Sequence, residues 1–155
     1  MAAFLHGDVT ASIAASDALA IAEGIGHRGW TATALRARGI AQQAGGDLAA
    51  AEASFRRSLA TSEHLPLFAC WAHARLGMVL VAADRLDDAA AHVEHALAIG
   101  PPLGHYEARL ARCALAVARA EPNVAELITD AADRASAGGH RASLADLAIL
   151  PDDAG

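Results

Sequence analysis

Two stretches of the chain carry the same pattern 38 residues apart, and this spacing is the strongest constraint on the fold. Residues 35–55 read LRARGIAQQAGGDLAAAEASF and residues 73–93 read HARLGMVLVAADRLDDAAAHV, which places Gly39 and Gly77 at equivalent positions. A glycine inside a helix costs about 1 kcal/mol relative to alanine. Its recurrence therefore indicates that each copy needs the glycine for packing, as expected of a protein built from helical repeats.

A third copy follows the same register and extends the pattern along the chain. Within each copy the apolar positions recur at i, i+3, i+7 and i+11, which is one face of a helix. Hydrophobic residues make up 54% of the chain but aromatic residues only 4%, and alanine is the most abundant of the apolar types. Because alanine favours helices and sheets normally need more aromatic and β-branched residues, the sequence predicts an all-α fold.

Helix-breaking residues divide the copies into pairs of helices. Gly45 and Gly46 end one predicted helix, and Asp47 can cap the next by accepting hydrogen bonds from its free N–H groups. Ala83-Asp84 and Glu121-Pro122-Asn123 occupy equivalent places in the later copies. The predicted helices span residues 9–23, 30–44, 47–61, 67–82, 85–98, 103–120, 124–136 and 143–149.

The repeated pattern resembles the tetratricopeptide repeat. Gly77 and Ala89 are 12 residues apart, as are Gly39 and Ala51, and Pro101 follows eight residues after Val93, as in that family's motif. The period of 38 is longer than the common 34-residue form, and such longer repeats are similar to those in the C-terminal regions of large actinobacterial regulators of the LuxR or MalT-like ATPase type. The resemblance implies a right-handed α-α superhelix of three to four helix hairpins.

The repeat boundaries define the expected organisation of one domain over residues 1–155. The apolar face of a terminal repeat needs covering, so both ends of the chain are expected to act as caps. The apolar run LADLAIL near the C-terminus is a candidate contact for a homodimer. The expected segments are a degenerate N-terminal repeat or cap over 1–29, repeats over 30–66 and 67–102, a degenerate repeat over 103–137, and a C-terminal cap helix and tail over 138–155.

Charge is divided unequally between the first and second helices of the hairpins. The first helices carry six arginines and one acid, Glu107, whereas the second helices carry nine acids and four arginines. In the tetratricopeptide family the first helices line the concave side of the superhelix. The resemblance therefore implies a basic inner wall in a protein whose formal net charge is −6.

This basic wall is the candidate binding groove. Arginine suits carboxylates because its planar fork donates two parallel hydrogen bonds, and an exposed tryptophan can anchor a partner. We expect the groove to bind an acidic peptide or a partner domain. Alternatively, these arginines only shield apolar surface with their stems or pair with acids of neighbouring helices. The predicted contact residues are Arg36, Gln43, Trp71, Arg75, Arg109, Arg112 and Arg119.

The sequence shows no pattern typical of catalysis or of a cofactor. His92 and His95 form HVEH on a second helix, without a third ligand at a defined spacing, and their register places both near the solvent side. Cys70 and Cys113 are expected to be buried, reduced thiols. We therefore expect no metal, no cofactor and no enzymatic activity, with a metal- or thiol-dependent enzyme as a distant alternative.

Composition narrows the remaining classes. A net acidic chain is poorly suited to nucleic acid, and the absence of any run of about 20 uncharged apolar residues argues against a membrane span. No signal peptide is recognisable at the N-terminus, so a cytoplasmic location is expected. The favoured function is a protein–protein interaction scaffold. The alternative is the sensor segment of a larger transcriptional regulator, binding a small inducer.

Overall fold

The computed structural model describes residues 9–99 and 101–150, which form eight α-helices and no strand. The all-α prediction is therefore confirmed for these residues, while the expectations for residues 1–8 and 151–155 lie outside the described part of the chain. The helices are α1 (Val9–Gly24), α2 (Arg28–Ala44), α3 (Leu48–Thr61), α4 (Pro66–Ala82), α5 (Leu86–Ala98), α6 (His105–Ala118), α7 (Val124–Ala137) and α8 (Arg141–Leu147).

Two helices begin earlier than predicted because histidine side chains cap them. His27 Nδ1 accepts a hydrogen bond from Trp30 N at 3.1 Å, so α2 begins at Arg28 and not at residue 30. His140 Nδ1 accepts from Ser143 N at 3.4 Å, so α8 begins at Arg141 and not at residue 143. Asp47 caps α3 as predicted, with its Oδ1 accepting from Ala50 N at 3.0 Å.

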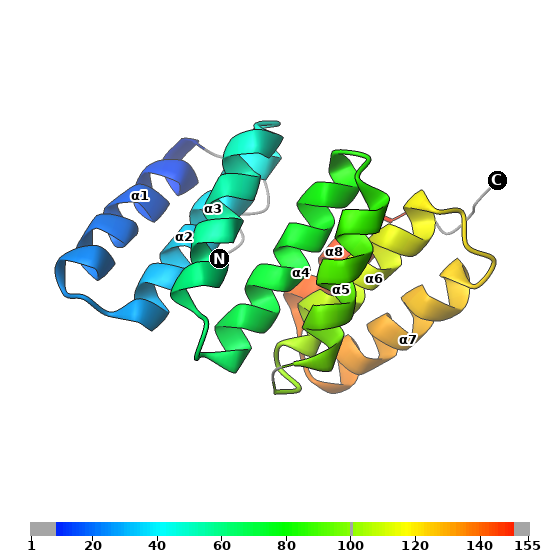
Figure 1. Cartoon of the computed structure of the whole chain (residues 1–155). Helices are drawn as coiled ribbons and strands as arrows, with labels where there is room; N and C mark the ends of the chain where they lie inside the picture. The colour runs from blue at the N-terminus through cyan, green and yellow to red at the C-terminus, as the bar shows by residue number, and fades with distance from the viewer. Residues whose placement is uncertain (1–8, 100, 151–155) are drawn as a thin grey trace.

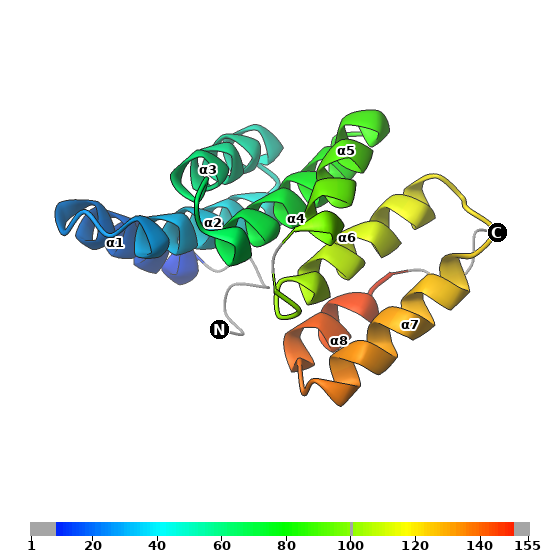
Figure 2. The same ribbon diagram turned by 60° about the horizontal axis from the view of Figure 1, so that its bottom comes forward.

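The helices pack as successive hairpins whose first members touch one another. The hairpins pair α2 with α3, α4 with α5 and α6 with α7, while α2 also contacts α4, α4 contacts α6, and α6 contacts α8 (Figure 1). We call α2, α4, α6 and α8 the first-helix row. Helices α3 and α5 lie on one side of the part of the row formed by α2, α4 and α6, and α8 lies on the other side (Figure 2).

Five of the turns between helices share one backbone device. In each, a single residue with positive φ ends the preceding helix, and the residue after it donates its N–H to a carbonyl five positions back, which is the Schellman arrangement. The bond runs from Asp47 N to Gln42 O at 3.0 Å in one turn and from Arg85 N to Leu80 O at 2.9 Å in another. The positive-φ residues are Gly26, Gly46, Asp84, Ala120 and Gly139.

The repeated glycines lie where the two helices of a hairpin approach most closely. A Cβ at Gly39 would lie 2.5 Å from Phe55 Cε1, and a Cβ at Gly77 would lie 2.7 Å from Val93 Cγ2. Both facing side chains are essentially inaccessible to solvent, so neither can move aside freely. The absence of a side chain at these positions is therefore what permits the contact between α2 and α3 and between α4 and α5.

The core runs through the hairpins and continues to the C-terminal helices. Its largest cluster includes Phe55, Leu76 and Leu80, and a second cluster joins Leu110 of α6 to Leu147 of α8. Both cysteines are buried free thiols, as expected. Among the described helices, none combines the length and the apolar character that crossing a membrane would need.

Candidate functional site

Three charged side chains from three helices of the first-helix row meet at Glu107. Arg36 of α2 donates to Glu107 from Nε at 3.3 Å and also forms a close ion pair with it through Nη2. Arg75 of α4 donates from Nε to the other side of the same carboxylate, at Oε2, 2.9 Å away. Glu107 lies in the first turn of α6, where an acidic side chain also interacts favourably with the helix dipole.

This arginine–glutamate cluster is largely withdrawn from solvent. The exposed fractions of the side chains are 21% for Arg36, 9% for Arg75 and 8% for Glu107. Burial lowers the pKa of Arg36 to about 9, with repulsion from Arg75 adding to the shift and Asp146 opposing it. Burial also lowers the pKa of Arg75. Both arginines remain charged at pH 7, so the two guanidinium groups and one carboxylate carry a net charge of +1.

Trp71 completes the predicted contacts on this part of the row. The Arg36 guanidinium carbon lies 5.3 Å from the centre of the Trp71 ring, in a cation–π contact, and Phe68 packs edge-on against the same ring at 5.6 Å. Gln43 is partly buried and lies seven residues after Arg36, on the same face of α2. The structure thus brings together Arg36, Trp71 and Arg75, with Gln43 farther along α2.

The three predicted arginines of α6 are engaged elsewhere. Arg109 lies 3.8 Å from an Asp130 carboxylate oxygen of α7, and Arg119 pairs with Asp87 of α5 at 2.9 Å. Arg112 pairs with Glu121 in the following turn. Residues two apart on a helix differ by about 200° in direction, so Arg109 faces away from Glu107. All six predicted arginines therefore have acidic partners within the chain, which matches the alternative considered for them.

Two acids that the sequence did not assign to the site contribute to it. Glu107 was visible as the single acid among the first helices, and that isolation was the available signal. Asp146 of α8 is half-buried and interacts electrostatically with Arg75 and Arg36. Burial raises the pKa of its carboxyl, and the two arginines and His140 oppose that shift. No local sequence pattern relates Asp146 to helices 70 or more residues earlier.

Histidines form a separate cluster between α4 and α5. The ring centres of His92 and His95 lie 5.1 Å and 5.0 Å from that of His73, and His73 Nδ1 lies 2.8 Å from His92 Nδ1. The placement of His92 near solvent was wrong, because packing against α4 leaves it half-buried. Burial, with repulsion from the two other histidines, lowers the pKa of His73 to about 4, so it is neutral at pH 7.

The histidine cluster does not meet the geometry of a metal site. Within residues 9–99 and 101–150, no group of three or more histidine, cysteine or acidic residues is arranged to hold a metal ion. The rings of His73 and His95 are stacked, with planes only 21° apart, and do not point at a common centre. The cluster contributes instead to packing between the two helices of one hairpin.

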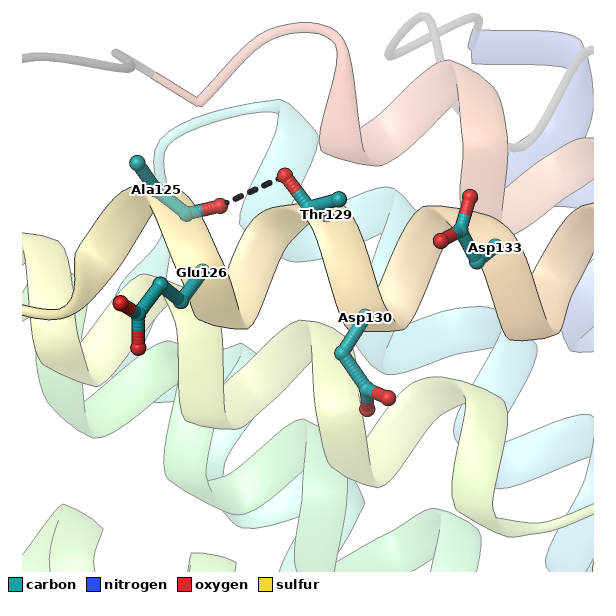
Figure 3. A pocket seen from close by; sticks show the side chains of 5 residues that line it. All are labelled: Ala125, Glu126, Thr129, Asp130 and Asp133. Atoms are coloured by element: carbon teal, nitrogen blue, oxygen red, sulfur yellow. Dashed lines mark hydrogen bonds between the residues drawn. The ribbon is translucent and has the colours of Figure 1, made fainter.

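Two surface depressions lie outside the arginine–glutamate cluster. One, of about 450 Å³, runs along the solvent-facing side of α7, and the side chains of Glu126, Asp130 and Asp133 that border it belong to that single helix (Figure 3). The other, of about 360 Å³, lies where the α1–α2 and α3–α4 turns meet, between His27, His64 and Phe68. Neither was predicted, and neither contains a predicted contact residue.

Comparison with known proteins gave no relative: no family model, curated protein or solved structure matches the chain. The functional conclusion below therefore rests on the residues and geometry of this chain.

Proposed function

We propose that the chain is a non-catalytic repeat module of the tetratricopeptide type, in which stacked helix hairpins present a surface for an acidic peptide or partner domain. Two features support the repeat. The glycine of the first helix faces a side chain 16 residues later in both hairpins, Phe55 for Gly39 and Val93 for Gly77. The positive-φ turns at Gly46 and Asp84 also recur at the same period of 38 residues.

The observation that carries the binding function is the sharing of one carboxylate by two guanidinium groups beside an aromatic ring. Arg36 and Arg75 both donate to Glu107, and Trp71 lies against Arg36. Guanidinium groups with low exposure form stronger bonds to carboxylates than fully hydrated ones, because less water competes. A carboxylate of a partner would thus meet two cations and a rigid ring at one place on the first-helix row.

Binding of a fluorescent decaglutamate peptide, followed by anisotropy, tests the proposal. We expect binding that weakens as salt is raised, and a loss of roughly tenfold or more in affinity for Arg36→Met, because one of the two charged donors is removed. Arg36 is the residue to change because the pair between Arg75 and Glu107 then stays intact. Circular dichroism establishes that the variant is folded.

Arg57→Met is the matched control. Arg57 lies on α3, its side chain is 59% exposed, and it pairs with Glu23 of α1, away from the cluster. The same loss of one positive charge there should leave peptide affinity nearly unchanged. Equal losses for Arg57→Met and Arg36→Met would show that the peptide responds only to net charge, and absence of binding to the natural chain and to an uncharged variant of Asp146 would refute the function.

A further inference from the structure

Helix α8 is the least strongly held member of the first-helix row. It has seven residues, of which only Ser143 and Leu147 are buried. An isolated helix of this length is not stable in water, so α8 depends on its contacts with α6 and α7. Leu147 supplies the main apolar contact, packing in the cluster of Leu110 and Cys113 of α6 and Ala131 of α7. With a single large buried anchor, α8 can open locally without unfolding the hairpins.

The position of α8 relates it to the arginine–glutamate cluster. It lies on the side of the row opposite α3 and α5 (Figure 2) and carries Asp146, which is half-buried. The Asp146 carboxylate acts on Arg75 and Arg36 electrostatically, although it forms no ion pair within 4.0 Å with either of them. It brings the charge of the four residues from +1 to zero. Asp146 thus neutralises the cluster from a distance, without the direct bonds that Glu107 makes.

We propose that α8 is an internal occupant of the acidic-partner surface, and that an acidic peptide binds by displacing α8 and replacing the charge of Asp146. This inference rests on the proposed function and adds its regulation. Opening of α8 removes the balancing carboxylate and uncovers the apolar surface around Leu110. The preferred partner is therefore an acidic segment that also carries an apolar side chain able to take the place of Leu147, rather than a purely charged one.

Amide hydrogen exchange on the full chain, with and without saturating decaglutamate, tests displacement directly. The amides of Leu144 and Ala148, which donate to His140 O and Leu144 O, report whether α8 is formed. We expect the peptide to accelerate their exchange about tenfold while the amides of α4 keep their protection. A peptide that binds without changing the exchange of α8 would overturn the inference, because it would share the surface with α8.

Asp146→Asn tests the electrostatic part. The substitution keeps the size of the side chain and removes the balancing charge, so decaglutamate should bind several-fold more tightly. Asp133→Asn is the matched control, since Asp133 is exposed on the outer side of α7 (Figure 3) and its loss should change affinity less than twofold. Equal affinities for the two variants would contradict the role of Asp146.

The outcomes separate this inference from the proposed function. Binding that depends on Arg36 but leaves α8 protected, with Asp146→Asn no tighter, supports the function and makes α8 a permanent cap. Binding seen only after Asp146→Asn supports both the function and the internal occupant. If neither the natural chain nor Asp146→Asn binds the acidic peptide, the binding function itself is wrong. An undecapeptide carrying leucine among the glutamates should bind more tightly than decaglutamate if Leu147 is also replaced.

Discussion

At the scale of single residues, two glycines decide how closely the hairpin helices approach. Gly39 and Gly77 were recognisable in the sequence because they repeat, and the resemblance to tetratricopeptide repeats implied tight packing there. The structure shows which atoms impose it: the Phe55 ring and a Val93 methyl group occupy the space of the missing side chains. The local cost of glycine in a helix is offset by the contact it permits.

Gly77→Ala should destabilise the protein by about 1–3 kcal/mol, because the new Cβ would overlap Val93 Cγ2 in a packed interior. Urea unfolding followed by circular dichroism measures the change in the free energy of unfolding. Gly24→Ala is the control, since a Cβ there meets nothing within 4 Å and alanine is the better helix former. A Gly77→Ala protein as stable as the natural chain would show that the close approach is not required.

At the scale of elements, the helix spans could be predicted but their first residues could not always be. Periodicity and glycine-rich breaks located all eight helices within a few residues. The starts of α2 and α8 were missed because His27 and His140 cap them, and histidine is not among the usual N-cap residues. Neither was the positive φ of Ala120 foreseen, because alanine rarely adopts that conformation.

Ala120→Gly should stabilise the protein by about 0.5–1 kcal/mol, because Ala120 has a φ of 50° and glycine adopts this conformation without the Cβ penalty. Ala120 is exposed, so the substitution removes no buried contact. The shift in thermal midpoint gives the measurement. Ala125→Gly, in the first turn of α7, should instead lower the midpoint, and a lower midpoint for Ala120→Gly as well would contradict the argument from backbone strain.

At the scale of the whole molecule, one carboxylate connects three hairpins. Glu107 of α6 bonds to Arg36 of α2 and Arg75 of α4, which lie 71 and 32 residues away in the sequence. Buried polar side-chain atoms of the described residues all have hydrogen-bond partners, so this cluster is satisfied where it stands. Its bonds run across the row, between helices that otherwise meet through apolar contacts.

Glu107→Gln should destabilise the protein by about 3 kcal/mol, because it leaves two neighbouring guanidinium groups without their shared anion in a site of low exposure. Urea unfolding measures this change too. Asp88→Asn is the control, because it removes an exposed partner of Arg85 and exposed pairs contribute little. If Glu107→Gln were as stable as Asp88→Asn, the cluster would not hold the hairpins together.

The sequence by itself determined the helical class, the division into hairpin-sized segments and the glycines that allow close packing. These properties follow from local rules, because a helix has a fixed period and turns have characteristic residues. Only the tertiary structure decided which charges meet, and it separated Arg36 and Arg75 from the arginines of α6 while bringing Glu107 and Asp146 to them. Such pairings depend on how the helices are turned against one another, and local periodicity does not contain that information.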